Sequence, residues 1–191
     1  DTIVPRDILT KSLSYFTSEN IGAVVVGIDV NAKNLLQKAT KIEYAIGISL
    51  SLNILSRLNS THVTPGPFTV FRKTVLDKIG GFSTTNITED MEIAYKIHKN
   101  GYKIKSCLEV EVITEVPSNF KDLYKQRKRW YTGAIQTLVQ HRDILFNKKL
   151  GVFGFFIPFN FTLIFLGVLL FVITSIISLH NVYKKISYYA L

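Results

Sequence analysis

The stretch GAVVVGIDV, residues 22–30, decides the fold class of this chain of 191 residues. Its β-branched, apolar run is typical of a short buried strand. Helical patterns lie on both sides of it: Pro5 stands at the first turn of one predicted helix, and Asn31 or Asn34 can cap a long helix that extends to about residue 58. A buried strand between two helices indicates an α/β fold.

The same alternation continues toward the C-terminus, with no internal repeat or low-complexity tract. We predict a strand at 67–73, a short helix at 74–82 closed by Gly80-Gly81, a helix at 89–101, one or two strands over 102–116, and a helix at 121–141. Helices that alternate with short apolar strands indicate an α/β layer sandwich.

A long apolar run follows this domain. From Leu150 to His180 no side chain is formally charged, and about 20 apolar residues suffice to cross a bilayer. The run would reach about 46 Å as one helix, against a hydrocarbon core of about 30 Å. Because Pro158 and Asn160 interrupt it, we predict an interfacial or tilted lead-in up to Pro158 and a span from about Phe161 to Leu179. Its position excludes a secretory signal peptide.

The net charge of +9 is concentrated before this run, where Lys and Arg strongly outnumber Asp between residues 119 and 149. Cations beside a span favour the cytoplasmic side and anionic head groups, although Lys184 and Lys185 after the span leave its orientation open. The lone Cys107 permits no internal disulfide, which is compatible with a reducing compartment. The four His residues have no metal-site spacing.

The basic stretch KQRKRWYTG, residues 125–133, holds the only tryptophan. On a helix, Gln126, Arg129 and Trp130 share one face with Gly133, so that face offers an amide, a guanidinium, an indole and an open space. Such groups can clamp phosphate oxygens and stack against a sugar. The alternative is an amphipathic helix on the bilayer surface with an interfacial Trp, and the stretch alone leaves both open.

The stretch NITEDMEIAYKI, residues 86–97, places three polar side chains, Thr88, Glu89 and Asp90, at the start of a predicted helix. Acids suit the positive end of a helix dipole, and Asn86 with Glu89 has the spacing of a capping box. A carboxylate at such a junction can also be a general base.

Other acids, Asp29 and Glu43 among them, are predicted to be structural. The turn 65–67 is either an ordinary loop or a loop near a ligand.

Taken together, TED at 88–90, TEVP at 114–117 and QRKRW at 126–130, followed by a membrane segment, closely resemble the membrane-embedded family 2 glycosyltransferases. This family includes cellulose, hyaluronan, chitin and poly-N-acetylglucosamine synthases. TPGPFTVFRK, from residue 64, resembles the family's acceptor-side strand, and DTIVPRDIL, from residue 1, resembles the segment that begins at the last Asp of its D-x-D motif. The resemblance covers residues 1 to about 145.

The resemblance implies a GT-A fold, a nucleotide-sugar donor (most often a UDP-sugar), and Mg²⁺ or Mn²⁺. It implies these site residues: Asp90 as the catalytic base with Glu89 as its neighbour, Thr88, Gln126, Arg127, Arg129 and Trp130 as substrate-binding residues, and Asp1 as a metal ligand if the residue two positions before it is also Asp. Within the substrate-binding set, Arg127 fills a variable position of the motif.

We therefore predict three parts: the C-terminal half of a GT-A catalytic domain with its interfacial helix (1–145), a transmembrane segment (150–180), and a tail or loop (181–191). The family's nucleotide-gripping first half is absent from this sequence, so the fragment alone is expected to be inactive. The predicted protein is an integral membrane protein with its catalytic part in the cytoplasm.

The predicted function is inverting transfer of a sugar to a growing polysaccharide or a lipid-linked glycan, with membrane lipids as further partners. The alternative is a non-catalytic membrane protein whose basic helix binds lipid or an acidic partner. Nucleic-acid binding is not predicted, because the bilayer accounts for the cations and a single interleaved aromatic is no stacking platform.

Overall fold

The structure, a computed structural model, describes the backbone of residues 2–189 and the side chains of residues 2–184. Its elements are, in chain order, β1 (Thr2–Ile3), α1 (Ile8–Ser14), β2 (Ile21–Val30), α2 (Leu35–Tyr44), the π-helical segment η1 (Ala45–Leu50), α3 (Ser51–Arg57), β3 (Thr69–Phe71), α4 (Lys73–Ile79), α5 (Glu89–Lys99), β4 (Lys103–Thr114), α6 (Phe120–Gln140), the short 3₁₀ helices η2 (Arg142–Ile144) and η3 (Lys148–Leu150), and α7 (Val152–Tyr189).

The strands form one mixed sheet in the order β1-β4-β2-β3. Strands β2 and β4 are parallel, whereas β1 and β3 pair antiparallel at the two edges. The predicted strand at 22–30 is β2, and nearly every residue in it is buried because it lies inside the sheet. The segment 102–116 forms a single strand, β4, whose register shifts where β2 passes from Val26 to Gly27.

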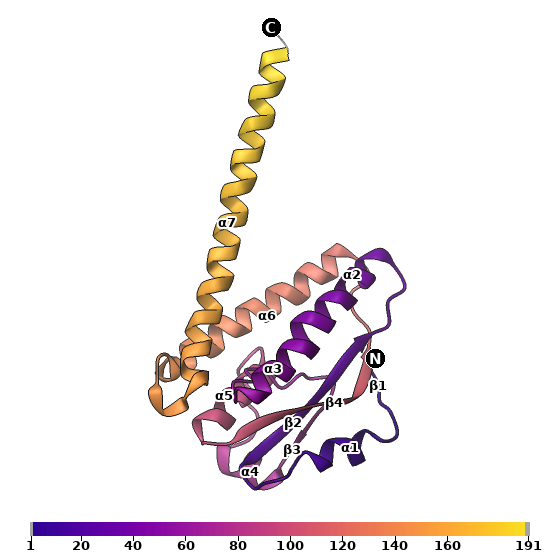
Figure 1. The fold of residues 1–191 in the computed structure, drawn as a ribbon, viewed down its shortest axis with the longest axis vertical. Coiled ribbons are helices and arrows are strands. Elements are labelled where there is room, and N and C mark those ends of the chain that lie inside the picture. Colours follow the sequence, from indigo (N-terminus) through magenta and orange to yellow (C-terminus); the bar gives the residue numbers. More distant parts are fainter. Residues whose placement is uncertain (1, 190–191) are drawn as a thin grey trace.

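Helices cover both faces of this sheet (Figure 1). Because side chains alternate along a strand, Val24 and Val26 pack with Ile8 of α1 on one face. On the other face, Ala23 and Val25 pack with a layer that contains α3 and α5. The predicted α/β layer sandwich is therefore confirmed.

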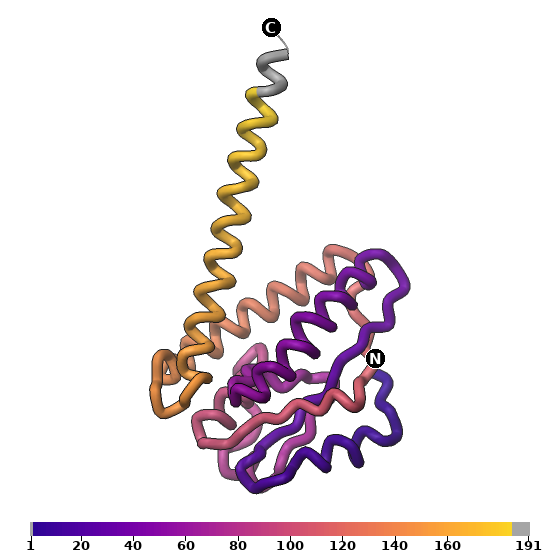
Figure 2. The backbone as a smooth tube through the Cα atoms, in the orientation of Figure 1, coloured from indigo at the N-terminus to yellow at the C-terminus, as the bar shows by residue number. Residues whose placement is uncertain are grey.

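The predicted long helix is one continuous helical path made of α2, η1 and α3 (Figure 2). Of the two predicted caps, Asn31 and Asn34, it is Asn34 that caps the helix: its side chain accepts a hydrogen bond from the N–H of Gln37 while the Gln37 side chain accepts one from the N–H of Asn34. No local pattern predicts the π-helical turn at η1. Ser49 of that turn accepts a 3.1 Å hydrogen bond from the N–H of Ile28, which fastens the helix to β2.

Asn86 and Glu89, which have the spacing of a capping box, do not form one at α5. The N-cap residue is Thr88, and it makes no side-chain capping bond. The Asn86 side chain instead accepts from the N–H of Thr88 at 2.8 Å and donates to Thr137 and Gln140 of α6. Asn86 is thus used for tertiary contact with α6, which no local pattern could indicate.

The interruption predicted at Pro158 and Asn160 is wrong, because α7 runs through both residues. Proline at 158 has no N–H for the carbonyl of Gly154. The N–H of Phe146 replaces it, with a 2.8 Å hydrogen bond to the Gly154 carbonyl. The loop before α7 therefore supplies the hydrogen bond to the Gly154 carbonyl that Pro158 cannot donate.

The base of α7 packs on the domain, and the rest of it projects away (Figure 1). Phe153 and Ile157 are fully buried and pack with Tyr95 of α5, and the Phe153 ring stacks on His98 at 4.2 Å. Beyond these turns the helix exposes large apolar side chains. The stretch Val152–Lys184 is long and apolar enough to cross a membrane.

Candidate active site

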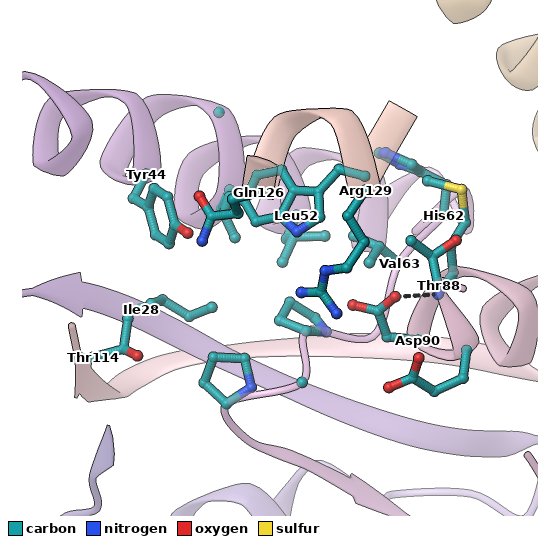
Figure 3. A pocket seen from close by; sticks show the side chains of 18 of the residues that line it. Ile28, Tyr44, Leu52, His62, Val63, Thr88, Asp90, Thr114, Gln126 and Arg129 are labelled. Atoms are coloured by element: carbon teal, nitrogen blue, oxygen red, sulfur yellow. Dashed lines mark hydrogen bonds between the residues drawn. The ribbon is translucent and has the colours of Figure 1, made fainter. Parts of the chain in front are cut away.

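A cavity of about 400 Å³ opens on the face of the sheet that carries α2, α3, α5 and α6 (Figure 3). The predicted site residues that line it are Thr88, Glu89, Asp90, Gln126, Arg129 and Trp130. The two motifs thus meet in one space, although 35 residues lie between Asp90 and Gln126 in the sequence.

Asp90 lies at the first turn of α5, where the side chain faces the cavity. Its backbone carbonyl accepts two hydrogen bonds from Thr64, one from the N–H at 3.0 Å and one from the hydroxyl at 2.8 Å. Desolvation by burial raises the pKa of the Asp90 carboxyl, and the nearby charge of Glu89 raises it further. The positive charge of Arg129 acts in the opposite direction, and Figure 3 shows its guanidinium pointing toward the Asp90 carboxylate.

Gln126, Arg129 and Trp130 line the cavity from one face of α6, as their spacing predicts. The open space predicted at Gly133 is absent. A β-carbon built at Gly133 would overlap the side chain of Thr88, which fills that place. Because Gly133 has no side chain, α6 can lie close against the start of α5 at this point.

Two side chains contact the Trp130 ring. The Tyr44 ring lies 6.3 Å from it in a tilted arrangement, and the Arg127 guanidinium lies 4.3 Å from its centroid. Arg127 also forms an ion pair of 2.6 Å with Glu43 of α2. Arg127 is not among the residues that line the cavity, and its contacts show a side chain that positions the indole and joins α6 to α2.

Part of the cavity wall comes from residues that the sequence did not single out, chiefly Tyr44, Gly47, Ser51 and His62. Thr114 and Glu115 of the TEVP motif also line the cavity. Tyr44, Gly47 and Ser51 lie at or beside the π-helical turn η1, and such turns are frequent at functional sites. Burial lowers the pKa of His62 to about 4, so its imidazole is neutral at physiological pH. The turn 65–67 also lines the cavity, which favours the second of its two interpretations, a loop near the candidate site.

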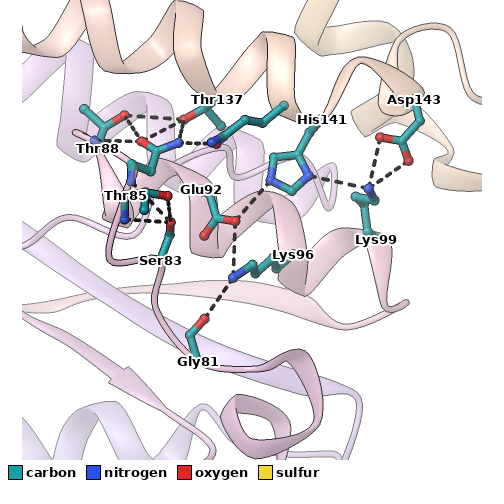
Figure 4. A network of polar contacts seen from close by, with 12 residues as sticks. Gly81, Ser83, Thr85, Thr88, Glu92, Lys96, Lys99, Thr137, His141 and Asp143 are labelled. Carbon is teal, nitrogen blue, oxygen red and sulfur yellow. Dashed lines mark hydrogen bonds and ion pairs between the residues drawn. The ribbon is translucent and has the colours of Figure 1, made fainter.

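A polar network holds α5 against α6 on the side away from the sheet (Figure 4). Buried Glu92 lies 3.2 Å from both His141 and Lys96, and Lys99 forms a 2.8 Å ion pair with Asp143. Together with the bonds of Asn86, these contacts fix the end of α6 against the helix that begins with Asp90. The relative position of Asp90 and Trp130 is therefore set by buried polar contacts as well as by apolar packing.

The predicted metal ligand, Asp1, lies outside the described residues. Among residues 2–184, no three His, Cys, Asp or Glu side chains come close enough to hold a metal ion. The described side chains thus do not form a metal site by themselves.

Comparison with known proteins gives relatives along most of the chain. It is 31% identical to the poly-beta-1,6-N-acetyl-D-glucosamine synthase of Staphylococcus aureus (strain COL) over 159 residues, which is 82% of this chain and 38% of that protein. It is 30% identical, over 158 residues, to the poly-beta-1,6-N-acetyl-D-glucosamine synthase of Staphylococcus epidermidis. The chain thus spans 38% of the length of these relatives.

The fold resembles the mannosyltransferase PcManGT from Pyrobaculum calidifontis, solved in complex with GDP-Man and Mn²⁺. The TM-score is 0.56 at 21% identity, over 73% of this chain and 36% of that one. This likeness confirms the predicted GT-A fold class, here followed by a long apolar helix. Since the family described as Glycosyl transferase family group 2 matches residues 1–190, this chain belongs to the family 2 glycosyltransferases, as its TED and QRKRW motifs predicted.

Proposed function

We propose that the intact protein is an inverting membrane glycosyltransferase that moves a sugar from a nucleotide-sugar donor to a growing polysaccharide or a lipid-linked glycan. The observation that carries this proposal is the common cavity of Asp90 and Trp130. It places a carboxylate with a raised pKa and a flat aromatic ring around one space. The family and the synthase relatives support glycosyl transfer as the chemistry.

In the proposed reaction, the acceptor hydroxyl gives its proton to the Asp90 carboxylate as its oxygen attacks the anomeric carbon. The bond from that carbon to the donor diphosphate breaks on the opposite face, and its electron pair leaves with the diphosphate. A positioned general base contributes about 10²–10⁴-fold to such a step. Arg129 stabilises the charge that grows on the diphosphate, because a guanidinium can donate two parallel hydrogen bonds to phosphate oxygens.

The Trp130 ring supplies the floor for the acceptor sugar. Its contacts with Tyr44 and Arg127 fix the plane of the indole, so that little freedom is lost when a sugar stacks on it. Gln126 lines the cavity one turn before Trp130 and can hydrogen-bond sugar hydroxyls. Thr88 and Glu89 line the cavity next to Asp90 and are proposed to contact the substrate there.

We further propose a UDP-sugar as donor, residues 1–145 as part of the catalytic domain, α6 as an interfacial helix, 150–180 as the membrane segment and 181–191 as a tail or loop, with the catalytic part in the cytoplasm. The membrane assignment is supported by the length and composition of α7. A divalent cation with Asp1 as ligand belongs to this proposal through the family resemblance alone, and no step above is assigned to it.

The proposal is tested with the full-length protein in membranes, supplied with a panel of nucleotide sugars. We expect one donor to be consumed with release of its nucleoside diphosphate, and we expect the new linkage to have the inverted anomeric configuration by NMR. Retained configuration would contradict the proposed displacement. Absence of turnover with every donor, in a preparation that binds acidic lipid, would favour the non-catalytic alternative.

Replacement of Trp130 by Ala is expected to weaken acceptor use more than donor use, because stacking on an aromatic face is lost while the diphosphate site is retained. The measurement compares transfer to acceptor with hydrolysis of the donor by water. Trp130→Phe keeps a flat ring and is the matched control, with a smaller expected loss. An equal fall of transfer and hydrolysis in Trp130→Ala would show that the ring does not bind acceptor.

A further inference from the structure

His62 is a titratable side chain on the cavity wall that has no part in the reaction proposed above. It lies in the segment between α3 and β3, is partly buried, and lines the cavity. Its ring nitrogen Nδ1 is buried, and no described residue forms a hydrogen bond with that atom. Buried polar atoms in folded proteins nearly always have a partner, so an exception on the wall of a cavity is a candidate for contact with a ligand.

Two other histidines of the domain have partners within the fold. The Nε2–H of His98 donates to the carbonyl of Thr61 at 2.8 Å. The Nε2 atom of His141 lies 3.2 Å from buried Glu92. Neither histidine is among the described residues that line the cavity. Structural contacts therefore account for these two imidazoles, whereas they leave Nδ1 of His62 unexplained.

The loop that carries His62 is fastened on both sides of this residue. On one side, the carbonyl of Thr61 accepts the hydrogen bond from His98. On the other side, the N–H and the hydroxyl of Thr64 donate to the backbone carbonyl of Asp90. Figure 3 accordingly shows His62 toward the same end of the cavity as Asp90. The imidazole is thus held near the proposed base.

The His62 ring also contacts the base of α7. Its centroid lies 5.6 Å from that of the Phe156 ring, and the two planes are tilted by 50°. Phe156 packs against the apolar cluster that joins α7 to α5. An apolar side chain would serve this contact as well as an imidazole, so packing on α7 does not explain a histidine at position 62.

The chemistry of a neutral imidazole suits a hydroxyl group. Since burial lowers the pKa of His62 to about 4, its ring carries no charge at physiological pH. The ring then has one N–H donor and one acceptor nitrogen, so it can donate to a hydroxyl or accept from one. A diphosphate is better matched by a cation such as Arg129. The same low pKa makes the ring a weak base, and deprotonation remains with Asp90.

We propose that the His62 imidazole forms a hydrogen bond with a hydroxyl of the acceptor sugar and thereby orients the attacking hydroxyl toward Asp90. This role rests on the proposed function, because it requires a sugar acceptor in this cavity. Stacking on Trp130 holds the face of the sugar but leaves rotation within the ring plane free. A hydrogen bond from the wall near Asp90 removes that freedom and selects one hydroxyl for attack. His62 is in this sense a residue that determines the linkage.

The test uses the full-length protein in membranes, supplied with the nucleotide sugar that the donor panel identifies. His62→Phe keeps an aromatic ring against Phe156 and removes both nitrogens. We expect transfer to the acceptor to fall about tenfold, the effect of one lost hydrogen bond, while hydrolysis of the donor by water stays unchanged. Methylation analysis and NMR of the product should show a larger share of linkages through another hydroxyl.

Three further variants separate hydrogen bonding from packing. His62→Gln and His62→Asn each place an amide near the position of one ring nitrogen, and at least one of them should recover most of the transfer. Phe156→Leu alters the packing on α7 and leaves the imidazole in place, so its transfer should stay close to that of the wild type. The thermal stability of His62→Phe should be no lower than that of the wild type, because a buried nitrogen without a described partner is removed.

Wild-type transfer and linkage in His62→Phe would overturn the role of His62 and leave the proposed function intact. Equal losses of transfer in Phe156→Leu and His62→Phe would overturn it in favour of packing on α7. Failure of both amide variants to recover transfer would exclude a hydrogen bond from this side chain. Lack of turnover in the wild type would overturn the proposed function itself, and this role with it.

Discussion

Asp90→Asn in the intact protein is expected to lower the rate of sugar transfer by about 10²–10⁴-fold, because an amide cannot take the proton of the acceptor hydroxyl. Binding of the nucleotide sugar should be largely unchanged, because Asp90 is proposed to contact the acceptor. The measurement combines initial transfer rates with donor binding. Asp77→Asn removes an exposed carboxylate on α4 and is the matched control. Wild-type turnover in Asp90→Asn would remove Asp90 from the role of base.

The same carboxyl sets a pH dependence. Burial raises the pKa of Asp90, so the base is protonated, and transfer falls, at a higher pH than an ordinary Asp would require. The stability of the fold depends on this carboxyl in the opposite direction to a salt-bridged acid, which stabilises the fold as pH rises. Because the folded state holds this proton more tightly than the unfolded chain, stability decreases as pH rises from the unfolded pKa through the folded one. The amide of Asp90→Asn does not ionise, so the variant avoids this loss of stability and should be at least as stable as the wild type at neutral pH. A low transfer rate in a variant of unchanged stability would then reflect lost chemistry and not unfolding.

Gly133→Ala is expected to produce the second large effect. In an exposed helix this change would stabilise by about 1 kcal/mol, since Ala is the better helix former. At Gly133 the new β-carbon overlaps Thr88, and overpacking of this kind costs about 1–3 kcal/mol. The overlap also moves the start of α5 away from α6, and a shift of about 1 Å in a reacting group can cost about 10²-fold in rate. We therefore expect lower thermal stability and a large loss of transfer.

The control is Gly167→Ala in α7, where an added β-carbon lies more than 4 Å from every described atom outside its own stretch of helix. It should leave transfer unchanged. Thr88→Ser removes the methyl group that meets the new β-carbon, so combined with Gly133→Ala it should restore part of the stability. If Gly133→Ala were as stable and active as the wild type, Thr88 would not set the spacing between α5 and α6.

Several features of the site became visible only with the fold. The contact of Gly133 with Thr88 joins residues far apart in the chain, whereas the sequence alone predicts open space at this glycine. Arg127 has the chemistry of a phosphate ligand, yet it stacks on Trp130 and pairs with Glu43. Tyr44 and Ser51 carried no chemical signal, and only the packing of α2 and α3 on the sheet brings them to the cavity.

The sequence by itself determined the elements whose signal is local: the buried strand β2, a helix cap at Asn31 or Asn34, the apolar helix α7, and the shared face of Gln126, Arg129 and Trp130. Hydrophobic period and capping chemistry act within a few residues, so they can be interpreted without knowing the fold. The tertiary structure alone decided where Asn86 bonds and how α7 continues through Pro158, because Thr137 and Phe146 supply the partners. Each of these depends on a hydrogen bond between separate segments, and a buried polar group takes whichever partner the packed chain brings to it.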